Sequence, residues 1–274
     1  MDQLVSLFVA LTVLSGSVAH QTKINLYNAC QFPVWPAWIP NAGVAQIAPG
    51  GAKIQPYESI HLLAPWGWSG RFWGRTDCSS SIAAINSSNT ANNHTMNTMI
   101  DCETGDCNGE LGCSSPGLPP ATLVEFTPLR DPHALLDHYD VSLVDGYNLP
   151  VRVIPSSGSC KSAGCSASAA DLLARCPPEL AIRRSGGDAG VIACKSPCLA
   201  FKEDRYYCTG EYGSARKCRP SPYSRCFKRS CPDAYSYAFD SLDSGFACPS
   251  GAEYTIVFCP RSYGHGSSES SSSW

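Results

Sequence analysis

The stretch from Ala64 to Cys78, APWGWSGRFWGRTDC, gathers the side chains best suited to hold a ligand, namely large aromatic rings with two arginines between them. Such a set could form a ligand platform with a charged floor, or its rings could fill the core beside a strand. Strand alternation places Arg71, Trp73 and Arg75 on one side and Phe72 on the other. We therefore expect Phe72 in the core, and the stretch as a whole to be part scaffold and part ligand-facing rim.

Cysteine chemistry indicates disulfides rather than a metal. The chain has 16 cysteines in 274 residues, which suits an oxidising compartment, and the even number favours full pairing. No C-x-x-C motif occurs, and the six histidines show no H-E-x-x-H or paired spacing of the kind that binds zinc. We expect no metal and no cofactor.

The N-terminus has the pattern of a secretory signal peptide. An apolar run from Leu4 to Leu14 is followed by small residues that end at Ala19, although no basic residue precedes the run. We expect residues 1–19 to be removed and the protein to be secreted, outside the cell in the apoplast or cell wall. Elsewhere no apolar stretch approaches the roughly 18 residues of a transmembrane helix, so no stable membrane insertion is expected.

The charge of the chain limits its partners. The formal charge is −3, and loss of the signal peptide with its single charged residue, Asp2, changes it to −2. A nearly neutral chain lacks the basic charge with which proteins bind nucleic acids or anionic membranes. We expect neither partner, and a monomer.

Alternating patterns predict strands joined by turns, in a chain with 23 Gly and 21 Pro. Strand patterns occur in TKINLYNAC, TLVEFTPL and EYTIVFC. The clearest predicted hairpin is HYDVSLVDGYNLPVRVI, with Val141 before an Asp145-Gly146 turn and Val151 after it. The expected fold class is mainly β, an antiparallel sandwich.

Short helical patterns replace the alternation between Cys160 and Cys231. Ser168 can cap a helix over AADLLARC that Pro177 ends, and Pro197 and Pro222 each suit a first helical position. The apolar content here is low, so we expect this segment to depend on disulfides. The C-terminal tail is low in complexity and is expected to be disordered.

Seven motifs in a fixed order give the sequence a close resemblance to plant thaumatin-like, pathogenesis-related proteins of the osmotin/thaumatin family. Within 22–260 they are GRFWGRTDC, TGDCNGELGC, TLVEF, YDVSLVDGYNLP, CPPEL, YSRCFKRSCPDAYSYAFD and FCP. The resemblance implies a thaumatin-like domain, 20–262, built on a flattened antiparallel β-sandwich. Its parts would be a sandwich core (20–75, 126–166 and 232–262), a small cystine-loop subdomain (76–125, with an insertion at 79–101) and a disulfide-rich helical subdomain (167–231), before a serine-rich tail (263–274).

The resemblance also implies a disulfide pattern. Its pairs are Cys30–Cys259, Cys78–Cys102, Cys107–Cys113, Cys160–Cys248, Cys165–Cys231 and Cys176–Cys194. Where the family has adjacent cysteines this chain has Tyr207 and Cys208, and an extra cysteine, Cys226, occurs further on. We predict the bridges Cys208–Cys218 and Cys198–Cys226, the second of which needs Cα atoms within about 7 Å; otherwise two thiols are free.

The insertion at 79–101 is longer than the family's usual loop. It contains two N-glycosylation sequons, Asn86-Ser-Ser and Asn93-His-Thr. Polar surface loops of secreted proteins are where such sites are used. We expect at least one of the two to carry a glycan, with an unmodified flexible insertion as the alternative.

The family has an acidic cleft lined by one arginine and four carboxylates, which match Arg71, Glu125, Asp140, Asp145 and Asp240 here. Glycoside hydrolysis requires one protonated and one ionised carboxyl, and clustered carboxylates push their pKa values apart. Glu125 and Asp140 are the candidates for the acid and for the base or nucleophile. The alternative is a structural salt-bridge network in which Asp145 caps its own turn.

Four tryptophans are candidates to stack on sugar rings: Trp35, Trp38, Trp66 and Trp68. Tryptophan is more often half-buried in a β core, so we expect most of them there. Trp66 and Trp68 precede the strand in a loop with Gly and Pro neighbours. They are expected to be the exposed pair.

The resemblance implies a secreted defence-type protein that binds β-1,3-glucan of fungal cell walls through this cleft. Whether it also acts as a weak endo-β-1,3-glucanase is left open by the sequence. Two alternatives stand beside this function: an inhibitor of digestive enzymes, and an antifungal protein that acts on a receptor or membrane without hydrolysing carbohydrate. Fold alone does not decide between them.

Overall fold

The structure, a computed structural model, describes residues 21–65, 67–82, 98–127, 136–184, 190–240 and 246–260. Its strands are β1 Gln21–Asn28, β2 Trp35–Pro40, β3 Ser59–Pro65, β4 Gly70–Ile82, β5 Thr98–Thr104, β6 Leu123–Phe126, β7 Leu136–Ser142, β8 Val151–Pro155, β9 Ala163–Gly164, β10 Ala181–Arg183, β11 Val191–Cys194, β12 Phe246–Pro249 and β13 Tyr254–Phe258. Its helices are α1 Ala169–Ala174, α2 Pro197–Phe201, α3 Asp204–Tyr207 and α4 Pro222–Ser230, with a 3₁₀ turn, η1, at Gly210–Tyr212. The expected signal peptide, the sequons at Asn86 and Asn93 and the tail at 263–274 lie outside the described residues.

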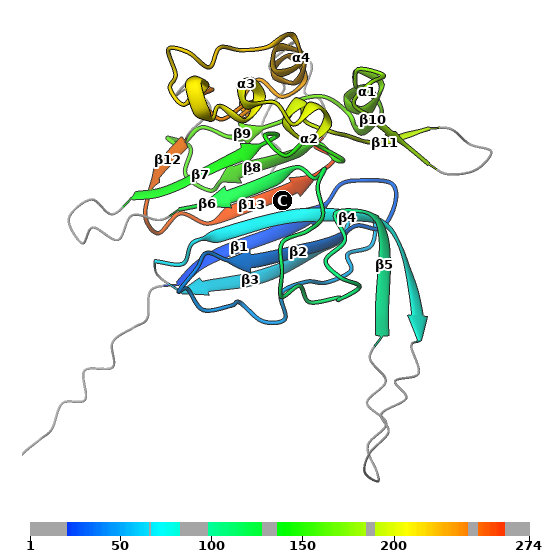
Figure 1. The fold of residues 1–274 in the computed structure, drawn as a ribbon. Helices are drawn as coiled ribbons and strands as arrows, with labels where there is room; N and C mark the ends of the chain where they lie inside the picture. The colour runs from blue at the N-terminus through cyan, green and yellow to red at the C-terminus, as the bar shows by residue number, and fades with distance from the viewer. Residues whose placement is uncertain are drawn as a thin grey trace, which may run out of the picture.

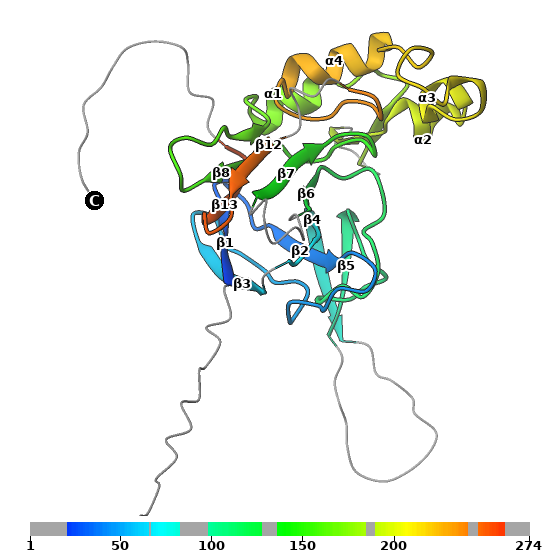
Figure 2. The same ribbon diagram turned by 90° about the vertical axis from the view of Figure 1, so that its left-hand side faces the viewer.

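Two sheets pack face to face, and the helices gather on one side of the pair (Figure 1; Figure 2). A five-stranded sheet has the order β3-β1-β13-β8-β9, and a six-stranded sheet contains β12-β7-β6-β4-β2 with β5 paired to β4. The strand pairs are antiparallel apart from β1 and β13, which run in parallel. The expected mainly β, antiparallel sandwich is confirmed.

Alternation along the strands directs one set of rings into the space between the sheets. Phe72 of β4 is fully buried, and its ring meets the ring of Phe126 on β6 edge to face, at a centroid distance of 5.9 Å. Phe126 packs in turn against Tyr254 of β13 in the other sheet, at 5.2 Å. Phe72 is thus the core residue that the alternation predicts, and its neighbours Arg71 and Trp73 project from the opposite, outer face.

The hairpin predicted in HYDVSLVDGYNLPVRVI does not form. Strands β7 and β8 belong to different sheets, because β7 pairs with β6 and β12 whereas β8 pairs with β13 and β9. The turn itself exists, since the Gly146 N–H donates to Leu143 O at 2.9 Å, but Tyr147 then pairs with Cys194. Turn chemistry does not specify a partner strand, and the contact with Cys194 leads the chain away from β7.

Serine caps begin three of the helices, and the sequence predicts the first of them, Ser168. Ser168, Ser196 and Ser221 each accept a hydrogen bond from the backbone N–H three residues on. Pro197 and Pro222 stand in the first turns of α2 and α4. The caps satisfy N–H groups that a helix start leaves without partners.

Aromatic contacts attach the helices to the sandwich. Tyr147, which follows the turn after β7, meets Phe227 of α4 edge to face at a centroid distance of 4.9 Å. Both side chains are almost completely buried, and the Tyr147 hydroxyl donates to Leu172 O at 3.2 Å. The helical segment therefore shares one hydrophobic core with the strands.

Seven disulfides join the described residues, between the pairs expected for them: Cys30–Cys259, Cys78–Cys102, Cys107–Cys113, Cys160–Cys248, Cys165–Cys231, Cys176–Cys194 and Cys208–Cys218. The predicted Cys198–Cys226 bridge is absent, and both cysteines are free. The two thiols face different parts of the chain. Cys198 Sγ donates to Tyr206 O at 2.8 Å, whereas Cys226 Sγ contacts Arg175 O at 3.4 Å. An even number of cysteines therefore does not imply full pairing here.

Candidate functional site

Three of the five expected cleft residues form a row across neighbouring strands on the outer face of the six-stranded sheet. Arg71 of β4 lies opposite Glu125 of β6, and Glu125 lies opposite Asp140 of β7. Opposite residues on antiparallel strands have Cα atoms about 4.5–5.5 Å apart and point to the same face. The register thus assembles side chains that are far apart in sequence, and we call Arg71, Glu125 and Asp140 the acidic row.

A loop held by the Cys107–Cys113 bridge covers the neighbouring part of this face. Two residues along β4, Trp73 lies opposite Leu123 and is fully buried in a small hydrophobic cluster with the loop. Its Nε1 donates to Gly105 O at 2.8 Å. Gly117 lies so close to the ring that a Cβ there would be 2.4 Å from Nε1. The acidic row borders this covered patch, and its side chains are only partly exposed.

Arg71 has a weak ion pair and a hollow beside it. Its Nη2 lies 3.9 Å from Glu125 Oε1, with the two side chains 35% and 36% exposed. Arg71 and Asp145 line the same hollow, together with Trp73, Pro116 and Pro119. A hollow with apolar walls and charged groups at its rim suits a sugar ring, which has apolar faces and hydroxyl edges.

Burial raises the pKa of both carboxyls in the row. For Glu125, desolvation raises the pKa, the positive charge of Arg71 lowers it, and the negative charge of Asp145 raises it. For Asp140, desolvation and then the negative charge of Glu125 raise the pKa to about 7. Asp140 Oδ1 is buried without a hydrogen-bond partner among the described residues, which favours the protonated carboxyl.

Asp145 lies outside the row but acts on it. The residue is exposed, directly before Gly146 in the turn that follows β7. Its charge raises the pKa of Glu125, and it shares the hollow with Arg71. Asp145 therefore belongs to the rim of the site.

Asp240 is held by other groups. Its Oδ2 accepts hydrogen bonds from the Ser236 N–H at 2.8 Å and the Ser236 hydroxyl at 2.7 Å, and it lies 3.2 Å from Lys228 Nζ. Tyr235 lies near both Asp240 and Asp140. Burial raises the pKa of the Tyr235 hydroxyl, and the negative charges of the two aspartates raise it further. For Asp240 the structure therefore favours the salt-bridge alternative, with a role in holding the segment after α4.

The tryptophans lie mostly in the core, and Trp68 corrects one prediction. Trp38 is fully buried, whereas Trp35 is half-buried beneath Lys53, whose Nζ is 4.8 Å from the ring centroid. Trp68 is only 2% exposed and packs on Phe72 at a centroid distance of 5.4 Å. It was predicted to be exposed because Gly and Pro flank it, but the loop folds back onto the sandwich; Trp66 lies outside the described residues.

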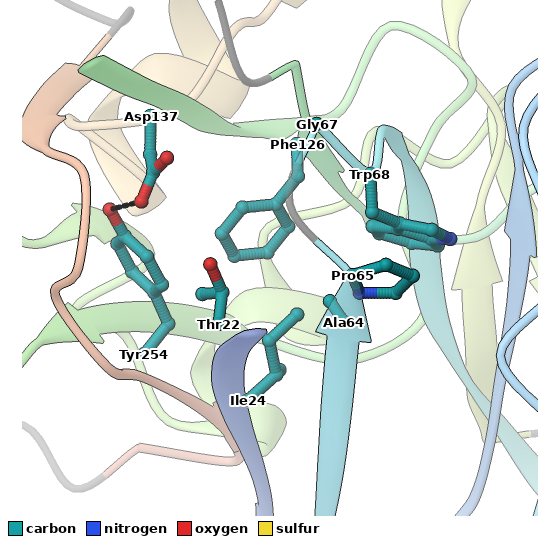
Figure 3. Close-up of a pocket in the computed structure, with 9 residues that line it drawn as sticks. All are labelled: Thr22, Ile24, Ala64, Pro65, Gly67, Trp68, Phe126, Asp137 and Tyr254. Atoms are coloured by element: carbon teal, nitrogen blue, oxygen red, sulfur yellow. Dashed lines mark hydrogen bonds between the residues drawn. The ribbon is translucent and has the colours of Figure 1, made fainter. Parts of the chain in front are cut away.

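A small hollow between the sheets contains a buried carboxyl that sequence reasoning missed. It lies beside Trp68 and Phe126, with Asp137 and Tyr254 at its other side (Figure 3). Asp137 accepts hydrogen bonds from the Tyr254 hydroxyl at 3.0 Å and the Ser250 hydroxyl at 3.0 Å. Alternation along β7 places Asp137 on the face opposite Asp140. Asp137 is part of the core. Its place on the inward-facing side of the alternating pattern of β7 could have indicated this from the sequence.

The second arginine of the opening stretch has a structural role. Arg75 is completely buried and donates from Nε to Trp35 O at 3.0 Å, from Nη1 to Glu110 O at 2.6 Å and from Nη2 to Leu111 O at 2.7 Å. Burial lowers its pKa to about 10. Arg75 thus holds the cystine loop against β4. Of the two arginines, only Arg71 belongs to the candidate site.

The described residues contain no helix that is long and apolar enough to cross a membrane. They also contain no group of three or more His, Cys, Asp or Glu side chains placed to hold a metal ion.

Comparison with known proteins gives consistent matches over nearly the whole chain. The model of the thaumatin family matches residues 28–260. Pathogenesis-related thaumatin-like protein 3.5 of Cryptomeria japonica is 45% identical over 93% of this chain and 97% of its own, and a glucan endo-1,3-beta-glucosidase of Prunus avium is 39% identical over 93% and 98%. A solved laminaripentaose-producing beta-1,3-glucanase, in complex with laminaritetraose, shares the fold with a TM-score of 0.56 at 11% identity, over 88% of this chain and 99% of its own. The chain belongs to the thaumatin family.

Proposed function

We propose that this protein is an extracellular defence-type protein that binds β-1,3-glucan of fungal cell walls through the acidic row. The observation that carries the proposal is the placement of Arg71, Glu125 and Asp140 side by side on one sheet face, next to a hollow with apolar walls. A relative named as a glucan endo-1,3-beta-glucosidase and relatives named as pathogenesis-related proteins support it. The seven disulfides and the expected signal peptide support secretion.

The chemistry of the row suits a neutral sugar chain. Carboxylates accept hydrogen bonds from sugar hydroxyls, and the Arg71 guanidinium donates them. The hollow offers the exposed rings of Pro116 and Pro119 to the apolar face of a sugar ring. Asp145 at the rim supplies a further acceptor, so a glucan chain would run along the sheet face beside the cystine loop.

A second candidate function, weak endo-β-1,3-glucanase activity, is favoured by the difference between the two carboxyls. Asp140, with a pKa raised to about 7, is the proton donor to the glycosidic oxygen as its bond to the anomeric carbon breaks. Glu125, whose pKa the positive charge of Arg71 lowers against the effect of burial, faces the positive charge that develops at that carbon. It acts either as nucleophile or as the base that activates water.

Depletion from solution by insoluble linear β-1,3-glucan tests the binding proposal, with cellulose as the comparison polymer. The row variant is Glu125→Gln with Asp140→Asn, and the matched control is Glu58→Gln with Asp101→Asn, two exposed carboxylates outside the row. We expect selective depletion of the wild type and of the control, and binding of the row variant weakened about tenfold or more, since a hydrogen bond to a charged group contributes about 1.5–3 kcal/mol. Equal depletion by cellulose, or equal binding of all three proteins, would reject the acidic row as the glucan site.

Reducing ends released from the same glucan test the second function. Release by the wild type that is lost in Asp140→Asn alone, at unchanged binding, would establish hydrolysis. Binding without release by any of the proteins would identify a glucan-binding protein without this activity.

A further inference from the structure

The positive charge of the chain is concentrated in one segment. Residues 195–231 carry nine Lys and Arg against three Asp and Glu, a formal charge of +6, whereas the rest of the chain carries 11 against 20, or −9. This segment contains α2, α3, η1 and α4, which lie together on one side of the sandwich (Figure 1). We call it the basic lobe. A net charge near zero therefore hides two regions of opposite sign.

The charges of the basic lobe face solvent. Its exposed basic residues are Lys195, Lys202, Arg205, Arg216, Lys217, Arg219, Arg225 and Arg229. Among these, the ion pair recorded within the described residues is Arg205 with Glu203. Arg225 and Arg229 lie one turn apart on α4 and project from the same face. The lobe thus presents cationic groups that are not neutralised by its own acids.

Two of these arginines meet at a hollow in the lobe. Arg205 and Arg219 line it together with Ser221, Ser236 and Tyr237. Arg205 bonds Glu203 through Nε at 2.7 Å, so its two terminal amino groups remain for another acceptor. Arg219 makes no hydrogen bond or ion pair with another described residue. Two guanidinium groups beside several hydroxyls form a site for an anionic group that is carried on a polar ligand.

We propose that the basic lobe binds the carboxylates of an acidic, uronic-acid-containing polysaccharide, with Arg205 and Arg219 as its main contacts. A guanidinium matches a planar carboxylate with two parallel hydrogen bonds. The Tyr237 hydroxyl can exchange hydrogen bonds with a neighbouring sugar hydroxyl, whereas the hydroxyls of Ser221 and Ser236 are bonded to Ser224 and Asp240. This site is separate from the acidic row and does not depend on the proposed glucan binding.

The surroundings of the hollow favour a polysaccharide over other polyanions. Val144, next to Asp145, also lines it, so the negative charges of the acidic site begin close by and oppose the dense charge of a nucleic acid. A membrane-surface helix would need apolar side chains on its free face, but the exposed residues of α4 are Pro222, Arg225 and Arg229. A flexible polysaccharide can follow the lobe and leave the acidic side uncovered.

The test is binding of the mature protein to immobilised polygalacturonate at low salt. The site variant is Arg205→Gln with Arg219→Gln, and the matched control, Lys53→Gln with Lys161→Gln, removes the same charge from exposed positions outside the lobe. We expect the wild type and the control to bind, the site variant to bind at least about tenfold more weakly because charge-assisted hydrogen bonds are lost, and fully methyl-esterified polygalacturonate not to be retained. Binding of the site variant to insoluble β-1,3-glucan should be unchanged, which keeps this result separate from the glucan proposal.

Several results would overturn the inference. No retention of the wild type on polygalacturonate would reject an acidic polysaccharide as the ligand. Equal weakening in the site variant and the control would show general charge attraction without a site. Tighter binding to DNA or to phosphatidylserine vesicles than to polygalacturonate would identify a different class of partner. Arg225→Gln with Arg229→Gln, whose side chains lie outside the hollow, should weaken binding less than the site variant, and the reverse order would move the site to α4.

Discussion

Glu125 and Asp140 lie directly opposite each other on β6 and β7, and the negative charge of Glu125 adds to burial in raising the pKa of Asp140 to about 7. Arg71, opposite Glu125 on the other side, counteracts the rise in the pKa of Glu125. The register of three strands therefore gives the two carboxyls neighbouring charges of opposite sign. Surroundings that push two carboxyl pKa values apart are what acid and base chemistry on a glycosidic bond requires.

Glu125→Gln should lower the pKa of Asp140. The substitution removes the neighbouring negative charge but leaves the desolvation, which is the larger cause of the shift, so the pKa should stay above its ordinary range. Carboxyl ¹³C chemical shifts recorded during a pH titration measure it, with Glu58→Gln as the control. An Asp140 midpoint that is the same in all three proteins would contradict the coupling.

Stability should fall as the pH rises through the pKa of Asp140. Its folded pKa of about 7 is above the value of about 3.9 in an unfolded chain, so the folded state binds the extra proton in between. The stabilisation is complete below about pH 4 and is lost by about pH 7, and it amounts to at most about 4 kcal/mol. Urea unfolding at several pH values should show a smaller decrease for Asp140→Asn than for the wild type, and parallel curves would argue against the raised pKa.

Arg75→Gln should destabilise the fold much more than Arg71→Gln. Arg75 is buried with three carbonyl acceptors, and leaving such groups unsatisfied costs about 1–3 kcal/mol each. Arg71 makes a partly exposed pair at 3.9 Å, so its loss should cost no more than about 1 kcal/mol. Urea unfolding at one pH compares the two, and equal losses would be inconsistent with the roles assigned to these arginines.

Thiol labelling should find two free cysteines in each chain. In denaturant both Cys198 and Cys226 should react with an alkylating reagent. In the native protein Cys226 should react first, because Cys198 is buried and burial raises the pKa of its thiol. Peptide mapping by mass spectrometry identifies the labelled residues, and a cross-linked Cys198–Cys226 peptide would restore the bridge that the structure lacks.

Local sequence patterns predicted the features that depend on residues adjacent in the chain, namely which strand residues face inward and where helices begin. The alternation of β4 placed Phe72 inside, and the Ser168 cap and the first-turn prolines Pro197 and Pro222 were found where the sequence indicates them. The partner of each strand could not be predicted in this way. HYDVSLVDGYNLPVRVI has the pattern of a hairpin, yet its halves pair in different sheets because Tyr147 bonds Cys194.

The candidate site shows the same contrast between what local patterns predict and what depends on contacts between distant segments. Motif similarity supplied its five residues, but burial separates their roles. Asp240 is occupied by Ser236 and Lys228, Trp68 folds onto Phe72, and the direction of the Cys198 thiol depends on the position of Tyr206. Each outcome depends on contacts between segments that are distant in the sequence, which residue types and spacing do not encode.

The most direct test of glucan binding at the acidic row is to add soluble laminaritetraose to the mature protein and follow the carboxyl ¹³C resonances of Glu125 and Asp140. We expect saturable shifts of both resonances with laminaritetraose, no such shifts with cellotetraose, and unchanged resonances of Glu58 and Asp101. Saturable binding that leaves Glu125 and Asp140 unshifted, or no binding at all, would contradict the acidic row as the glucan site.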